Sequence, residues 1–199
     1  MGGFYNLRGP LVFPPLTILR RRQNPANRVT CHCADSCSWR LHRRCSRHIG
    51  TSGAALLEVH DLDPSSGSLI TNMSTRGVVE TNASVMIGGF IVGAGLGTNG
   101  DGSSEVLIRA LGPELTGFGI SDALQDPTME LHDGNGNLLL ANDNWKDSQQ
   151  AAIQATGLAP GDNREPAILT TLIQGNWTAI VRGKNNTTDV GLIELYRIH

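Results

Sequence analysis

Hydrophobic and polar residues alternate along several short stretches of the chain after Gly50. In TMELHD, Met129 and Leu131 would face one side of a strand and the polar residues between them the other, which is the period of a strand with one buried face. The stretches VMIGGFIV, EVLIRALG and NWTAIVRG have the same character, and in the last one Trp177 shares the apolar side with Ala179 and Val181. Short strands at this spacing, separated by turn residues, predict an all-β fold, an antiparallel β-sandwich of jelly-roll type.

Turn residues and one short helical segment punctuate these strands. Asn135 and Gly136 are a favoured pair for a two-residue hairpin turn with positive φ. The segment QQAAIQAT predicts a helix of about two turns, with Asp147 or Ser148 as its N-cap and Gly157 at its end. This helix would be a crossover between hairpins and not a helical layer.

The chain contains the same strand pattern twice. LLEVHDL at 56–62 and LIELYRI at 192–198 match residue class by residue class at an offset of 136 residues. Because the match holds on both faces, both copies are predicted to fill one structural slot, that of a closing strand. We expect the second copy to close a sandwich at 76–199, and the first, within 50–75, to be the closing strand and linker of a preceding repeat unit. The sequence would then be the last unit of a tandem array, cut off upstream.

Composition separates the first 49 residues from the rest. The chain has 199 residues and a formal net charge of −2, but residues 1–49 hold nine arginines and one acid, and residues 50–199 hold seven basic and 17 acidic residues. Residues 20–49 show no apolar periodicity. The apolar run LVFPPLTIL is interrupted by prolines and followed, not preceded, by arginines, unlike a secretory signal, and it is too short to span a bilayer. We therefore predict a disordered leader, the product of a frameshift or a misplaced start codon.

Two further hypotheses concern this leader. It contains four cysteines with three histidines nearby, a composition that suggests zinc: Cys31, Cys33, Cys37, Cys45, His32, His42 and His48. Cys31 and Cys33 are too close for a zinc knuckle, whereas Cys33 and Cys37 have an acceptable spacing. The arginines suggest nucleic-acid binding. Both are weaker than the disordered-leader interpretation, and no nucleic-acid partner is expected for the sandwich.

The segments LHDGNGNLLLANDNW, ILTTLIQGNWTAIVRG and VGLIELY resemble the bacterial pre-peptidase C-terminal domain, a secreted β-sandwich. The matching positions are Asp133, Gly136, Asn142, Asp143, Gly175, Trp177, Val181, Gly183 and Gly191. The span from STRGVVE through RALGPELTGFG to the end is more similar still to repeat modules of large exported or surface proteins of bacteria. The resemblance implies a non-catalytic accessory role at an extracellular or cell-surface location, beside neighbouring repeat modules, without insertion into a membrane.

No motif of an enzyme stands out. Gly93 and Gly95 begin a glycine-rich stretch, but Thr98 occupies the third glycine position of a dinucleotide fingerprint, and a hairpin is expected next in place of a crossover helix. No Gly-x-Ser-x-Gly or His-Glu-x-x-His sequence occurs. His132 is interpreted as a solvated strand residue. We predict that the chain is not an enzyme and has no catalytic residues.

Calcium and carbohydrate are the candidate ligands. Calcium prefers carboxylate, amide and carbonyl oxygens, and the sequence predicts such groups at one end of one hairpin: Asp133, Asn135, Asn142, Asp143, Asn144 and Asp147. The alternative is that these residues form turns. Trp145, in a polar loop, is the candidate aromatic platform for a surface polysaccharide or protein, whereas Trp177 is expected in the core. The leading function is thus a spacer or adhesion module in a larger exported protein, and the alternative is a calcium- or carbohydrate-binding module.

Overall fold

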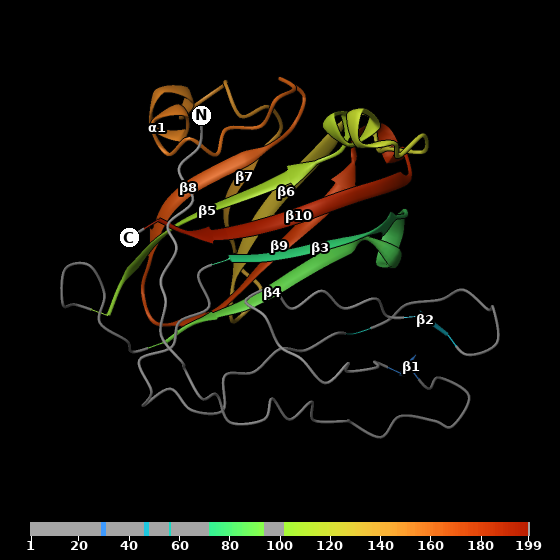
Figure 1. The fold of residues 1–199 in the computed structure, drawn as a ribbon. Helices are drawn as coiled ribbons and strands as arrows, with labels where there is room; N and C mark the ends of the chain where they lie inside the picture. Colours follow the sequence, from blue (N-terminus) through green and yellow to red (C-terminus); the bar gives the residue numbers. More distant parts are fainter. Residues whose placement is uncertain (1–28, 31–45, 48–55, 57–71, 94–101, 199) are drawn as a thin grey trace, which may run out of the picture. The chain divides into compact units, whose positions relative to one another are not determined.

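A computed structural model describes residues 29–30, 46–47, 56, 72–93 and 102–198 of the chain (Figure 1). The chain divides into two units, residues 1–69 and 70–199. In the first unit, β1 (Val29–Thr30) and β2 (Ser46–Arg47) form a short antiparallel pair. The predictions of a disordered leader, of zinc and of nucleic-acid binding otherwise lie outside the described residues, as does the first copy of the repeated strand beyond Leu56.

The second unit is an eight-stranded β-sandwich, which confirms the predicted fold class. Its strands are β3 (Asn72–Val79), β4 (Met86–Val92), β5 (Ser104–Leu111), β6 (Pro127–Asp133), β7 (Leu138–Asn142), β8 (Ala167–Leu172), β9 (Gly175–Gly183) and β10 (Asp189–Arg197). The first sheet has the order β3-β10-β5-β8 and the second sheet the order β4-β9-β6-β7, and every described pairing within them is antiparallel. Two four-stranded sheets in this order form a jelly roll.

Two features of the strands differ from expectation. β3 begins at Asn72, so residues 72–75, which were expected in a linker, pair with β10. β4 and β5 lie in different sheets, so the connection after Val92 is not the expected hairpin. The second difference follows from the topology, since a jelly roll repeatedly passes the chain from one sheet to the other, and local periodicity carries no information on which strands pair.

The hairpin between β6 and β7 has a different turn from the one predicted. Of the residues at its tip, Gly136 alone has a positive φ, of 84°. The backbone N–H of Gly136 donates to the carbonyl of Asp133, and the N–H of Asp133 donates to the carbonyl of Asn137. This is a three-residue loop closed by a left-handed glycine. The two-residue turn was the wrong choice because it would require positive φ at Asn135 as well.

The predicted helix is α1 (Gln150–Ala155), and Gly157, whose φ of 71° is left-handed, follows its C-cap residue Thr156. The predicted caps are wrong: Gln149 is the N-cap residue, and it makes no side-chain capping bond. Asp147 instead accepts a hydrogen bond from the Nδ2 of Asn144. α1 lies beside β8 (Figure 1), in the segment that leads from the second sheet to the first.

The main core lies between the inner faces of the two sheets. In β6 the predicted alternation is confirmed, since Met129 and Leu131 are almost fully buried. In β9, Ala179 and Val181 are buried and Trp177 packs against the same core, as predicted. β6 and β9 therefore form where the sequence alternates, because each of these two strands buries a single apolar face.

Two smaller apolar clusters cover the outer face of the first sheet. One lies beneath η4 (Pro113–Phe118) and consists of Leu111, Leu115, Ala123, Ile120, Val190 and Leu192. The other lies beneath residues 145–159 and consists of Leu107, Trp145, Ile153, Ala167, Leu158, Ala159, Leu169, Tyr196 and Ile198. The first sheet is therefore buried on both faces along β5 and β10, whereas none of the described clusters covers the outer face of the second sheet.

Candidate functional site

The structure separates the predicted calcium ligands into two groups. Asp133 lies at the tip of the β6–β7 hairpin, whereas Asn142 pairs with Met129 near the opposite end. Asp133 lies four positions after Met129 in β6, a distance of about 13 Å at the usual rise of a strand. The prediction that all these oxygen ligands meet at one end is therefore wrong. It failed because it did not take the length of the hairpin into account, which separates the residues at its tip from those at its other end.

At the tip, the loop itself satisfies the Asp133 carboxylate. Its Oδ1 accepts hydrogen bonds from the backbone N–H groups of Asn135 and Asn137 at 2.8 and 2.9 Å, and its Oδ2 accepts one from the Nδ2 of Asn137 at 2.9 Å. These bonds, that of the Asn137 side chain first, lower the pKa of Asp133. The arrangement is that of an aspartate that holds a turn.

At the other end, Asn142 and Asp143 connect separate segments. The Oδ1 of Asn142 accepts a hydrogen bond from the backbone N–H of Ala167 at the start of β8, at 3.0 Å. Asp143 contacts the Nζ of Lys184 at 2.6 Å, and Asp126 lies 3.8 Å from the same ammonium group. The bond to Asp143 raises the pKa of Lys184. Lys184 is thus the cation that these two carboxylates share.

Among the described residues, no set of three or more histidine, cysteine or acidic side chains is arranged to hold a metal ion. One oxygen each of Asp126 and Asp143 is buried without a hydrogen-bond partner, although both side chains are partly exposed. Binding of calcium by either group of oxygens stays a prediction.

Trp145 is buried, so its face is not a platform for a ligand. Its side chain is 3% exposed and belongs to the cluster over the first sheet. The indole N–H donates to the carbonyl of Asp162, and the ammonium group of Lys146 lies 5.0 Å from the ring centre. The indole N–H of Trp177 likewise donates to a backbone carbonyl, that of Ile173. The prediction for Trp145 failed because a polar loop sequence does not reveal that the loop folds back over a sheet.

His132 lies on the outer face of the second sheet, as expected, but it is not simply solvated. Its Nε2 lies 3.1 Å from a carboxylate oxygen of Glu130, and its Nδ1 lies 3.1 Å from the carbonyl of Gly136. Arg182 approaches the same Glu130 oxygen at 4.0 Å. The acid in this group therefore has two basic neighbours from its own chain.

A polar network on the outer face of the first sheet was not predicted. The Arg109 guanidinium in β5 donates to Glu194 in β10 at 2.6 to 2.7 Å and to the carbonyl of Leu158 at 2.6 Å. It also lies 5.2 Å from the ring centre of Tyr196. Glu194 raises the pKa of Arg109 against the opposing effect of burial. The signal in the sequence was the repeated glutamate of the two strand copies, at Glu58 and Glu194.

Glu165 is a second residue that sequence reasoning missed. Its side chain is 0% exposed. One carboxylate oxygen accepts hydrogen bonds from the backbone N–H groups of Gly112 and Glu114, both at 2.9 Å, and the other accepts one from Asp162 at 3.3 Å. Burial raises its pKa against the effect of these bonds. Glu165 thus joins the two segments that cover the first sheet, and no local pattern marks such a residue.

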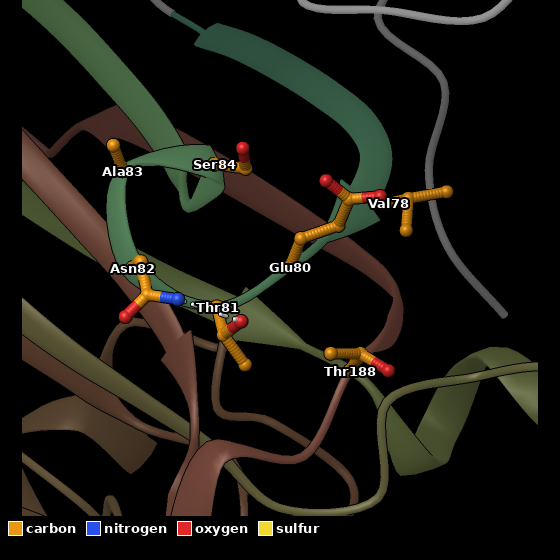
Figure 2. Close-up of a pocket in the computed structure, with 7 residues that line it drawn as sticks. All are labelled: Val78, Glu80, Thr81, Asn82, Ala83, Ser84 and Thr188. Atoms are coloured by element: carbon orange, nitrogen blue, oxygen red, sulfur yellow. Dashed lines mark hydrogen bonds between the residues drawn. The ribbon is translucent and has the colours of Figure 1, made fainter.

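An open depression of about 530 Å³ lies where β3 turns into β4. Figure 2 shows its lining, which consists of Val78, Glu80, Thr81, Asn82, Ala83, Ser84 and Thr188. Glu80 is its one ionisable side chain. The depression brings together no acid and base pair and no nucleophile with a partner, so its geometry supports no specific reaction.

No family model matches the chain, and no curated protein sequence matches it. Among solved structures, the chain is similar to the pre-peptidase C-terminal domain of a collagenase from Bacillus anthracis. The sequence identity is 12%, the match covers 63% of this chain and 89% of that one, and the TM-score is 0.39. Within the part of the chain that the structure describes, no helix is long and apolar enough to cross a membrane.

Proposed function

We propose that the chain is a non-catalytic β-sandwich module, a structural unit of a larger exported protein in which similar units follow one another. It acts as a spacer or adhesion unit at the cell surface. Its partners are the neighbouring modules and, through them, a surface protein or polysaccharide. The net acidity of residues 50–199 disfavours nucleic acid as a partner.

The observation that carries the proposal is the structural use of the motif residues. Asp133 holds a turn, Asn142 ties β7 to β8, and Gly136 supplies a left-handed φ. A Cβ on Gly183 would lie 1.9 Å from the carbonyl oxygen of Thr187, and one on Gly191 would lie 3.0 Å from Val79. These motif residues build turns and let the backbone approach closely, which supports a scaffold role.

The second copy of the closing strand supports the tandem arrangement. In β10, which lies between β3 and β5, each position has a distinct environment. Ile193 faces the main core, Leu192 packs in the cluster beneath η4, and Glu194 binds Arg109. The copy at 56–62 offers a residue of the same class for each of these roles. A sequence with suitable residues on both faces in this way fits a strand that lies between two neighbouring strands. The sandwich of residues 70–199 already contains a strand with this pattern in that position, which is β10.

A transplant of the first copy tests this proposal. Residues 192–198 become LLEVHDL through the substitutions Ile193→Leu, Leu195→Val, Tyr196→His, Arg197→Asp and Ile198→Leu. Since the copy preserves the inward and outward pattern, the full-length variant is expected to unfold in one cooperative transition at a moderately lower temperature.

The control shifts the transplant by one residue, so that residues 192–198 become ALLEVHD and a glutamate replaces Leu195 beside the core. A one-residue slip exchanges the faces of a strand, so this variant is expected to lose cooperative unfolding. If both transplants behave alike, 56–62 is not a second copy of β10, and the tandem proposal fails.

A further inference from the structure

No apolar cluster of the described residues covers the outer face of the second sheet, and the strand register shows which residues lie on it. Two rows cross all four strands: Gly89, Thr178, His132 and Leu138 form one, and Ile87, Ile180, Glu130 and Ala141 form the other. The pairing of His132 with Leu138 follows a register shift between Leu131 and His132. Exposed apolar side chains lie at both edges of this face, with Ile87 57%, Ile91 72% and Leu138 57% exposed. Isolated exposed hydrophobic residues are ordinary, but such residues on one open sheet face suggest a contact surface.

Gly89 distinguishes this face from a surface exposed only to water. Its neighbour Gly88 is explained by packing, because a Cβ there would lie 2.8 Å from the side chain of Ile193. A Cβ on Gly89 would meet nothing closer than 4.0 Å, and Gly89 has no positive φ. The fold of one chain therefore does not require glycine at 89. A glycine within a strand often marks a place where another molecule approaches closely.

We propose that a second copy of this chain packs on the outer face of the second sheet, with a two-fold axis along the boundary between β9 and β6. This axis reverses each row onto itself. Gly89 of one copy then lies over Leu138 of the other, and Ile87 lies over Ala141. At both edges a large side chain meets a small one, which is the complementarity that an isologous contact requires.

The axis places Ile180 of one copy over Glu130 of the other, so the contact does not depend on charge pairs between the copies. Glu130 has Arg182 and His132 of its own chain beside it, so covering it does not leave an isolated acid. In the other row, Thr178 of one copy lies over His132 of the other, a hydroxyl group over an imidazole. The face presents no block of like charge to its copy.

The size of the face predicts a weak and reversible dimer. Four strands spaced about 4.8 Å apart, with a length of about 24 Å for seven residues, give about 460 Å² per copy. A stable interface buries about 800 Å² per partner. The inference deepens the proposed role as a spacer or adhesion unit and rests on it.

The test is sedimentation velocity of the full chain, with reducing agent present because the leader contains four cysteines, from about 1 µM to about 1 mM, a range suited to weak association. The wild type is expected to pass from monomer to dimer. Gly89→Leu fills the hollow that receives Leu138, and Leu138→Ala empties it, so each variant is expected to weaken the dimer at least about tenfold, or 1.4 kcal/mol. The double variant Gly89→Leu with Leu138→Ala reverses the sizes and is expected to recover most of the affinity.

The control variants change exposed residues elsewhere on the same unit. Gly117→Leu adds a leucine at a glycine with open space around it, and Phe118→Ala removes an exposed ring; neither is expected to alter association. Circular dichroism melts show that each variant is folded. A wild type that stays monomeric to 1 mM, an effect of the controls equal to that of the face variants, or a double variant weaker than both single ones would overturn the inference. Since the transplant of segment 56–62 is judged by folding alone, a failed dimer with a folded transplant refutes this surface and not the proposed function.

Discussion

The two sheets of the sandwich share one core but differ on their outer faces. The first sheet is covered by two segments, 112–124 and 145–165, which bring their own apolar clusters and are joined by Glu165. On the second sheet, the outward side chains at Ile87, Ile91 and Leu138 are exposed. Outward positions on the first sheet therefore belong to the folded core, whereas those on the second sheet are available for contacts with other molecules. An outward position in an alternating strand can therefore be buried beneath a covering segment on the first sheet, whereas Ile87, Ile91 and Leu138 are exposed on the second sheet.

The largest expected difference follows from truncating one outward residue on each sheet. Leu107→Ala removes a side chain that is 0% exposed beneath residues 145–159, so it is expected to lower the free energy of unfolding by about 2 to 5 kcal/mol. Ile87→Ala, on the second sheet, is expected to cost less than about 1 kcal/mol. Urea titrations of both variants measure the difference, and equal losses would mean that the second face is covered in the folded chain.

The ion pairs of the two faces give the next comparison. Arg109 and Glu194 are 15% and 12% exposed, whereas Arg182 and Glu130 are 43% and 37% exposed and lie 4.0 Å apart. Removal of one partner from a buried pair leaves an uncompensated charge, so Glu194→Gln is expected to cost about 2 kcal/mol. Glu130→Gln is expected to cost less than about 0.5 kcal/mol. Thermal melts at low and at high salt provide the check, and a loss for Glu194→Gln that salt removes would place that pair at the surface.

Sequence periodicity predicted which residues lie on the inner faces of the strands. It could not predict that the segments 112–124 and 145–165 cover the outer face of the first sheet. Met129, Leu131 and Val181 occupy the positions that alternation assigns to them, because burial on one face is a local property. Trp145 and Glu165 were misjudged or missed, since their burial depends on a loop that returns over a sheet distant in sequence. The expectation that the calcium ligands lie at one end was wrong for a related reason, because spacing along the chain does not show which end of a hairpin a residue occupies.

The adjacent glycines of β4 allow the contrast to be tested within one strand. Gly88 faces Ile193 in the core, where a Cβ at 2.8 Å demands a shift, while Gly89 faces the open side. Gly88→Ala is expected to destabilise the fold by about 1 to 3 kcal/mol through overpacking. Gly89→Ala is expected to stabilise it by about 0.5 to 1 kcal/mol, since glycine weakens a strand. Chemical unfolding of both variants should give opposite signs, and destabilisation by Gly89→Ala would show that this glycine serves the fold itself.

The pH dependence of the cover over the first sheet is the smallest expected effect. Burial raises the pKa of Glu165 above its ordinary value of 4.5, so the folded state binds the proton more tightly than the unfolded state. Its contribution to stability is therefore complete below pH 4.5 and declines as pH rises through the folded-state pKa. With Glu165→Gln as the reference, the difference in unfolding free energy between wild type and variant should fall with rising pH, by at most about 1.4 kcal/mol per pH unit, and then level off.

Two neighbouring carboxylates set the range in which this measurement is clean. Arg164 holds the pKa of Asp162 at about 2, below its ordinary 3.8, so the contribution of Asp162 has the opposite sign: it is present above pH 3.8 and is lost as pH falls toward 2. Glu114, whose carboxylate accepts a hydrogen bond from Gly161, raises the pKa of Glu165 further. Urea titrations from pH 4.5 to 8 therefore isolate Glu165 from Asp162, and the companion variant Glu114→Gln should reduce the slope. A wild-type advantage that grows with pH in this range would mean that the three backbone N–H bonds outweigh burial, and that Glu165 stabilises the cover as a carboxylate.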